Sequence, residues 1–246
     1  MLQGFSSRPP ANRFLILFPG RTGSSWMVEA LSRHPGVRIE GEILVRRSAA
    51  EQRKAFKRLL GDGAQPGANG FKAKLKDVAE PEVLRSFVQE HDVSVIHMRR
   101  SDLLRLALSR INARRLHDAT GAWNVRAGMS PVDGGEIGVE ELVESLSSCR
   151  RDVLALEEYV RSLGVEPHVI EYADILVSPE AVLRTIQEFI GVPFRSLESS
   201  VFKNTSENLR RAVPNLDDLR RELGSGEWAS VFEIDPVSER SGSSSG

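Results

Sequence analysis

The sequence predicts an α/β fold, in which a mostly parallel central sheet is covered by helices on both faces. Short apolar runs alternate with longer amphipathic segments along the 246 residues, which is typical of strands joined by crossover helices. Hydrophobic residues make up 40% of the chain, enough for a sizeable core. Start and stop signals, such as Gly164 and Gly191, bound several of the amphipathic segments. Together these observations favour a three-layer sandwich.

The predicted elements alternate along the chain. Strands are expected at 13–18, 70–75, 93–98 and 167–172, with a weaker one at 37–39. Helices are expected at 24–34, 48–60, 80–91, 102–117, 139–163, 179–190 and 215–223.

The elements predict one domain over residues 13–232. The ends, 1–12 and 233–246, are rich in Ser, Gly and Pro and are expected to be disordered. Two polar loops, 61–69 and 120–138, interrupt the pattern, but neither has the composition of a linker between two complete cores.

Composition excludes several classes of function. The net charge is −1, which gives no global attraction to nucleic acid or to an anionic membrane. The single cysteine, Cys149, permits neither an intrachain disulfide nor a cysteine-based metal site, and it fits a reducing compartment. No window of 18 apolar residues predicts a membrane span, and the first residues lack the apolar stretch of a signal peptide. We therefore expect a cytoplasmic protein.

The first motif is FPGRTGSSWM, residues 18–27, between the first predicted strand and the first predicted helix. A glycine-rich turn here exposes backbone N–H groups at the positive end of the helix dipole, and Arg21 adds a charge suited to oxyanions. The segment is also compatible with an ordinary turn, in which Gly23 eases the bend and Ser24 caps the helix.

The motif differs from the G-x-x-x-x-G-K-[ST] phosphate loop, because Ser24 stands where the lysine is required. The later strands VSVIHM and PHVIEY also lack a terminal acid to hold Mg²⁺. A kinase or nucleotide hydrolase is therefore disfavoured.

The segment PGRTGSSWM resembles the 5′-phosphosulfate-binding loop of sulfotransferases that use 3′-phosphoadenosine 5′-phosphosulfate (PAPS). The resemblance implies a P-loop-like sandwich, PAPS as co-substrate, its 3′,5′-bisphosphate PAP as product, and no metal. It implies that Arg21 also stabilises the leaving charge. The implied cofactor-binding residues of this loop are Arg21, Thr22, Gly23, Ser24, Ser25 and Trp26.

A second segment, VIHMRRSDLLRLALSR at 95–110, resembles the 3′-phosphate-binding segment of bacterial glycolipid and nodulation-factor sulfotransferases. Arg99, Arg100 and Ser109 fill its arginine and serine positions. Arginine at the carboxyl end of a strand also points into the crevice where α/β folds bind ligands. Which of the two arginines meets the phosphate is left open, and a solvated basic helix is the alternative.

Further segments match the same family in order along the chain. GFKAKL, residues 70–75, resembles the G-x-K strand of carbohydrate sulfotransferases; it implies that Lys72, ahead of Lys74, balances sulfonate charge. ATGAW, 119–123, resembles an element that shapes the acceptor pocket, and 169–194 resembles a strand followed by a capped helix.

The closing segment beginning at Phe202 resembles the one that covers the nucleotide in this family. It makes Lys203 and Asn204 cofactor candidates, with Trp228 a weaker one. Loops 43–69 and 118–138 are expected to set acceptor specificity.

Transfer to a hydroxyl requires a base close to the sulfur. Glu42 occupies the acidic turn that carbohydrate members place after the first helix, although Ile43 replaces the common proline. Glu40 is a rival, because it projects to the same side of an extended stretch. His117, on the helix that leads to ATGAW, is a further candidate for the base or an acceptor contact.

The resemblance implies a sulfotransferase that acts on a hydroxylated small molecule or glycan, with no nucleic-acid partner. The alternatives are a nucleotide-binding regulatory protein of the same fold without turnover, and a P-loop-like kinase.

Overall fold

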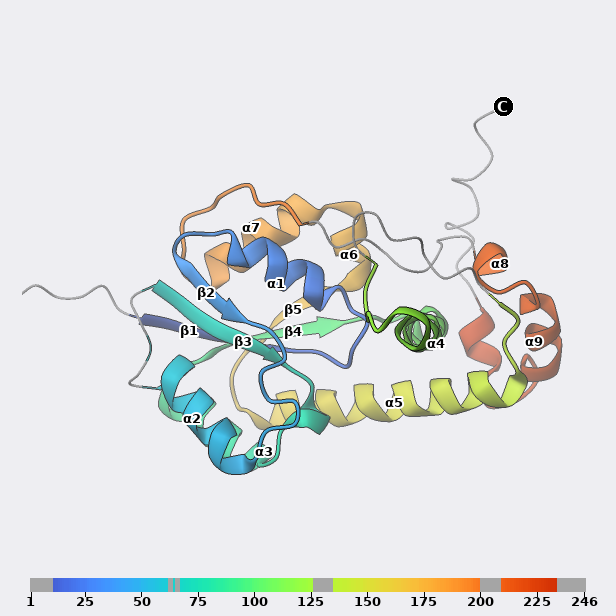
Figure 1. The fold of residues 1–246 in the computed structure, drawn as a ribbon, viewed down its shortest axis with the longest axis horizontal. Coiled ribbons are helices and arrows are strands. Elements are labelled where there is room, and N and C mark those ends of the chain that lie inside the picture. The colour runs from blue at the N-terminus through green and yellow to red at the C-terminus, as the bar shows by residue number, and fades with distance from the viewer. Residues whose placement is uncertain (1–10, 62–63, 65–66, 126–134, 200–208, 234–246) are drawn as a thin grey trace, which may run out of the picture. The chain divides into compact units, whose positions relative to one another are not determined.

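A parallel sheet of five strands forms the centre of the computed structural model, which describes residues 11–61, 64, 67–125, 135–199 and 209–233 (Figure 1). The strand order is β2-β3-β1-β4-β5, and every pairing is parallel. The strands are β1 (Ala11–Leu17), β2 (Val37–Glu40), β3 (Gly67–Ala73), β4 (Ser94–Arg99) and β5 (His168–Glu171). This sheet confirms the predicted α/β class.

Strand β1 lies in the middle of the sheet, so both of its faces are buried. Leu15 is aligned with Phe71 on β3 and with Val95 on β4. Since side chains alternate along a strand, Leu15 and its neighbours pack on one face, whereas Phe14 packs on the other. Burial on both faces explains why this strand reads as a continuous apolar run.

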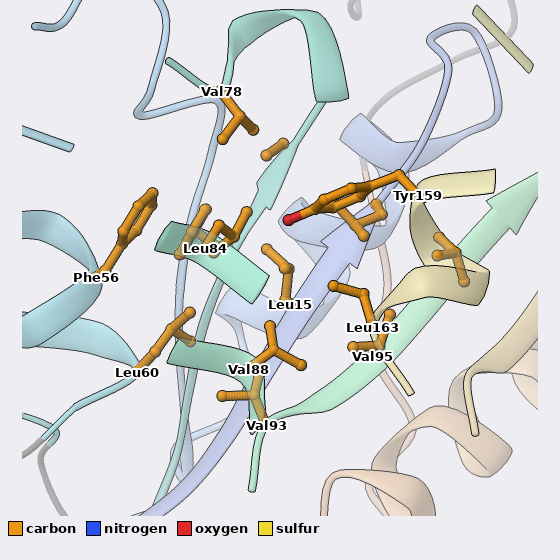
Figure 2. Close-up of a cluster of buried hydrophobic side chains, with 14 of the residues drawn as sticks. Leu15, Phe56, Leu60, Val78, Leu84, Val88, Val93, Val95, Tyr159 and Leu163 are labelled. Carbon is orange, nitrogen blue, oxygen red and sulfur yellow. The ribbon is translucent and has the colours of Figure 1, made fainter. Parts of the chain in front are cut away.

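One face is covered by α2 (Ala49–Leu59), α3 (Pro81–Glu90) and the C-terminal part of α5 (Val139–Ser162). Figure 2 shows Phe56, Leu84 and Tyr159 from these helices converging on Leu15. The hydroxyl of Tyr159 donates a hydrogen bond to the carbonyl of Pro81 at 2.8 Å, so its one polar atom is satisfied within the core.

The opposite face is covered by α1 (Ser24–Ser32), α6 (Tyr172–Val177) and α7 (Pro179–Phe189). Met27, Ile175 and Ile186 from these helices pack against Phe14 and its neighbours. In Figure 1, α1 and α7 lie on the side of the sheet away from α2 and α3. The fold is therefore the three-layer, P-loop-like sandwich that the sequence predicts.

The chain groups into two compact units, residues 1–101 with 152–200 and residues 102–151 with 201–246. The first holds the sheet and the 3₁₀ turn η1 (Leu75–Asp77). In the second, Asn215 exchanges two hydrogen bonds with the backbone of Ile137, at 3.1 and 2.9 Å. The second unit contains α4 (Leu103–Thr120), the first part of α5, α8 (Leu209–Ala212), α9 (Leu216–Leu223) and η2 (Ala229–Phe232). A single domain over 13–232 stays a prediction.

Several predicted boundaries are wrong. β1 begins at Ala11, inside the stretch expected to be disordered, and β3 begins at Gly67, inside the expected loop 61–69. The two segments pair with each other from Ala11↔Gly67 onward, so tertiary pairing overrides their polar composition. β3 also ends at Ala73 rather than at residue 75.

Three helical segments differ from the prediction. The strand expected at 167–172 ends at Glu171, and Tyr172 begins helix α6, which the sequence did not indicate. Helix α4 continues to Thr120, where Gly121 ends it with a φ of 74°. The short helix α8 was also missed. Residues 1–10, 126–134 and 234–246 of the expected ends and loop lie outside the described residues.

Across the described ranges, every helix is either too short or too polar to span a bilayer.

Replacing Gly70 by alanine should destabilise the sheet. A Cβ at this position would lie 2.3 Å from the carbonyl oxygen of Phe14 and 2.7 Å from its ring. Overpacking of this kind costs about 1–3 kcal/mol. Urea unfolding of Gly70→Ala should show the loss, whereas Gly41→Ala, which meets no described atom within 4 Å, should unfold like the wild type. Equal stability of the two variants would contradict the close approach of β1 and β3.

Candidate functional site

The loop between β1 and α1, residues 18–23, has an unusual backbone. Gly20, Arg21 and Gly23 have φ angles of 104°, 55° and 79°, the left-handed region that costs energy for a residue with a side chain such as Arg21. Gly23 is the N-cap residue of α1, and no side chain caps this helix. Ser24 is therefore the first residue of the helix and not its cap.

Thr22 supplies a buried polar atom in this loop. Its side chain is 0% exposed, and its hydroxyl Oγ1 has no hydrogen-bond partner among the described residues. A buried hydroxyl without a partner costs free energy, so Thr22, beside an uncapped helix N-terminus, is a candidate for contact with a ligand. The N–H groups and dipole of α1 favour an anionic ligand there.

Two arginines approach each other beside the loop. Arg100, at the end of β4, is 8% exposed; its Nη1 donates a hydrogen bond to the carbonyl of Arg21 at 3.1 Å. Its guanidinium lies 4.4 Å from the ring centroid of Tyr172. Burial lowers the pKa of Arg21, and the charge of Arg100 lowers it further, against smaller opposing effects of Tyr172 and Glu42. A bound anion would relieve this repulsion.

Arg99 has different surroundings from Arg100. Its side chain is exposed, and Nη2 forms an ion pair with Glu157 on α5 at 3.4 Å. Alternation along β4 explains the difference, because Arg100 follows Met98 toward the face covered by α1.

The turn after Arg100 is fixed by Glu171, which accepts hydrogen bonds from the backbone N–H and hydroxyl of Ser101, both at 2.8 Å.

Lys72 connects the loop to the acidic turn after β2. It is 5% exposed, and its Nζ donates hydrogen bonds to Oγ of Ser24 at 3.3 Å and Oγ of Ser25 at 3.0 Å. The same ammonium lies 3.3 Å from Oε1 of Glu42 and 5.1 Å from the ring centroid of Phe18. Burial lowers the pKa of Lys72, while Glu42 raises it. The structure thus brings together the start of α1, Lys72 and Glu42, all of which the sequence predicts as parts of the site.

Glu42 is held by two lysines. Lys72 contacts Oε1, and Lys74 donates a hydrogen bond to Oε2. Burial raises the pKa of Glu42, but the hydrogen bond from Lys74 and the charges of both lysines outweigh burial, so the pKa lies below its ordinary value. The carboxylate is therefore ionised at neutral pH.

Glu40 has a different charged partner from Glu42. Both of its carboxylate oxygens accept hydrogen bonds from the guanidinium of Arg58 on α2, and this lowers its pKa. Glu40 ends β2, whereas Glu42 follows the strand in a turn, so they do not share the strand face that the sequence predicts. Of the two acids, Glu42 is the one that contacts Lys72.

The second unit carries two other predicted site residues. His117 stacks on Trp123 with ring centroids 4.1 Å apart, and the indole is 55% exposed. Ser109 is buried in α4. Their roles stay predictions, and Lys203 and Asn204 lie outside the described residues.

The structure adds two residues to the contacts of the predicted site: Lys74, which the sequence ranks behind Lys72, and Tyr172. The signal for Lys74 was its spacing of two from Lys72, which puts both on one side of an extended chain. Tyr172 carried no such signal, because its contact with Arg100 depends on the pairing of β5 with β4. In the part of the chain that the structure describes, no group of three or more His, Cys, Asp or Glu side chains could hold a metal ion.

The chain is similar in sequence to a known protein over nearly its whole length. No family model matches it. The chain is 26% identical to nodulation protein H of Rhizobium tropici over 257 residues, covering 96% of this chain and 99% of that protein. The similarity extends over nearly the whole of both sequences and confirms the resemblance that the motifs predict.

Several solved structures are similar to this chain at low sequence identity. A mouse sulfotransferase SULT7A1, solved with PAP, has a TM-score of 0.47 and 16% identity, covering 75% of this chain and 61% of that one. A sulfotransferase from Alicyclobacillus acidocaldarius has a TM-score of 0.49 and 14% identity, covering 91% and 98%. A sulfotransferase domain of the curacin biosynthetic pathway has a TM-score of 0.44 and 16% identity, covering 77% and 76%.

Glu42 should stabilise the fold in a pH-dependent way. Because its pKa is lowered in the folded protein, its contribution is present above its unfolded value and is lost as the pH falls through the folded value. Glu42→Gln should therefore be less stable than the wild type at pH 7, and the difference should disappear in acid. Urea unfolding from pH 7 to pH 3 measures it, with exposed Glu188→Gln as control. A difference independent of pH would contradict the ion-pair geometry.

Proposed function

We propose that the protein is a sulfotransferase that moves a sulfuryl group from PAPS to a hydroxylated acceptor. The observation that carries this proposal is the buried, unpartnered hydroxyl of Thr22 beside the uncapped N-terminus of α1, joined through Lys72 to Glu42. Full-length similarity to nodulation protein H supports it. A cytoplasmic location and a metal-independent reaction remain predictions of the sequence.

The loop between β1 and α1 fits the 5′-phosphosulfate. The backbone N–H groups around Gly23, the hydroxyls of Thr22, Ser24 and Ser25 and the guanidinium of Arg21 are all suited to phosphate and sulfonate oxygens. Trp26 is only partly buried and packs against the core beneath α1, so its proposed role is to support the loop. PAPS supplies an activated sulfonate, and the residues of this loop bind and orient it.

Arg100 is our choice for the 3′-phosphate. It is buried beside Arg21 and held by Tyr172, whereas Arg99 is exposed and already paired with Glu157. An arginine held against an aromatic ring loses less conformational freedom when it binds. Ser109 stays a candidate for the same phosphate on the strength of the sequence motif.

Glu42 is the proposed base. Its ionised carboxylate would accept the acceptor's hydroxyl proton while the acceptor oxygen forms a bond to sulfur. The bond between sulfur and the bridging phosphate oxygen breaks, and its electron pair stays on that oxygen. Arg21 and Lys72 are positioned to stabilise the negative charge. This role of Lys72 stays a prediction.

The proposed acceptor is a carbohydrate, a glycolipid or another small hydroxylated molecule. Trp123 offers an exposed indole that His117 holds from one side, an arrangement suited to an amphipathic surface such as a sugar ring. His117 is therefore a candidate for an acceptor contact, and the base is assigned to Glu42.

Two measurements test the proposal. Calorimetric titration with PAP, with and without Mg²⁺, should show tight binding that does not need the metal, whereas preference for ATP with Mg²⁺ would favour a kinase. Transfer of radiolabelled sulfate from PAPS to a panel of glycans, glycolipids and phenols should then show turnover. Binding without transfer to any acceptor would favour the regulatory alternative.

Glu42→Gln should bind PAP like the wild type and lose activity by about 10²- to 10⁴-fold, because a positioned base contributes about that much. Glu40→Gln is the matched control, since Glu40 is paired with Arg58, and it should keep near-wild-type turnover. Near-wild-type turnover of Glu42→Gln would overturn the assignment.

Arg100→Ala should weaken PAP binding by about tenfold to a hundredfold, the value of a hydrogen bond to a charged group. Arg99→Ala, one residue earlier, should change the affinity little, because Arg99 pairs with Glu157. Calorimetric titration with PAP compares the two, and Arg100→Lys keeps the charge where loss of folding is a concern. The reverse order of effects would assign the 3′-phosphate to Arg99.

A further inference from the structure

Lys74 is the residue of the charge cluster around Glu42 to which the proposed function gives no part. It lies just beyond the end of β3, two residues after Lys72. Its side chain is 25% exposed, whereas that of Lys72 is 6% exposed. The two lysines therefore share one carboxylate but differ in their surroundings.

The carboxylate of Glu42 is divided between them. Lys72 contacts Oε1 and also reaches Ser24 and Ser25 at the start of α1. Lys74 donates a hydrogen bond to Oε2. Of the two lysines, only Lys72 contacts the hydroxyls at the start of α1. Lys72 thus lies between the carboxylate and the helix, while Lys74 holds the carboxylate's other oxygen.

Lys74 is itself held in place. Its Nζ lies 5.5 Å from the ring centroid of Phe18, a distance at which a cation is attracted to an aromatic face. Asp77 in η1 forms an ion pair with the same ammonium, with 3.9 Å between Nζ and Oδ2. A Cβ at Gly20 would lie 3.7 Å from Cε of Lys74, so the loop between β1 and α1 passes against its stem. These contacts restrict a side chain that would otherwise be flexible.

We infer that Lys74 is a positioning residue for Glu42: it orients the carboxylate by holding Oε2, leaving Lys72 to serve the sulfonate. The inference rests on the proposed function of Glu42 as the base. An ammonium that touches both the base and the reacting group cannot orient the base independently of the ligand. A second ammonium, that of Lys74, is anchored by Phe18 and Asp77 and can orient the base whether or not the ligand is bound.

The charged groups that face Glu42 are consistent with this role. They are Lys72 and Lys74 from the end of β3, with Arg21 from the loop before α1 and Asp77 beyond Lys74. Hydrogen bonding from Lys74 is the largest of the effects that lower the pKa of Glu42. Its removal should therefore move the titration of Glu42 toward higher pH.

Lys74→Met tests the inference, since it keeps an apolar stem against Phe18 and removes the charge. The acid limb of the pH profile of kcat should move up by about one pH unit, and the plateau should fall about tenfold as the carboxylate loses one fixed contact. The affinity for PAP should change less than threefold. Lys74→Arg should restore much of the plateau.

Lys76→Met is the matched control. Lys76 lies in η1, is 58% exposed and pairs with Asp152 at 3.9 Å, so its loss should leave the pH profile unchanged. A purely structural role of Lys74 would lower the melting temperature without moving the acid limb, and that result would overturn the inference. A loss of PAP affinity as large as that of Arg100→Ala would also overturn it.

Failure of the proposed sulfotransferase function can be distinguished from failure of the inference about Lys74. The carboxyl carbon of Glu42 can be titrated by NMR in ¹³C-glutamate-labelled protein, with Glu42→Gln to identify its signal. If no acceptor is sulfated but Lys74→Met raises this titration midpoint, the positioning contact stands and the enzymatic proposal fails. An unchanged midpoint overturns the inference whatever the activity.

Discussion

The buried ammonium of Lys72 is the interaction on which the arrangement of this site depends. A lysine that is 5% exposed must be paired or lose its charge, and here it is surrounded by two hydroxyls and a carboxylate. The hydroxyls belong to the first turn of α1 and the carboxylate to the turn after β2, so the lysine on β3 joins three separate stretches of chain. Satisfying one charge therefore fixes the spacing of the helix N-terminus, the lysine strand and the acidic turn.

The parallel sheet makes this possible, because the carboxyl ends of neighbouring strands open onto the same edge. β1 leads into the glycine-rich loop, while β3 on one side brings Lys72 and β4 on the other brings Arg100. Side-chain alternation then sends Arg100 toward the face covered by α1 and leaves Arg99 on the other, beside Glu157. The positions of Lys72, Arg99 and Arg100 therefore follow from the order of the strands and from the alternation of side chains along each strand.

The apolar runs and glycine positions predicted most of the fold, and the membership of the site stays a prediction. The apolar runs predicted the strands because β1 is buried on both faces, and the glycines predicted the loop because its backbone requires positive φ. The polar first residues of β1 and β3 were not predicted as strand. Residues 67–69 are typical of a loop by composition, yet they pair with residues 11–13. The polar composition of those residues favours a loop, and pairing with the partner strand overrides it.

Residue identity by itself determined which groups are available: Arg21 and Thr22 in a glycine-rich turn, paired arginines after a strand, and two acids near the first crossover. Only the tertiary structure decided how they are used. It separated Glu40, bound to Arg58, from Glu42, bound to Lys72 and Lys74, and it buried Arg100 against Tyr172. The reason is physical: a charged side chain takes its role from the charges and burial around it, and these come from segments distant in sequence.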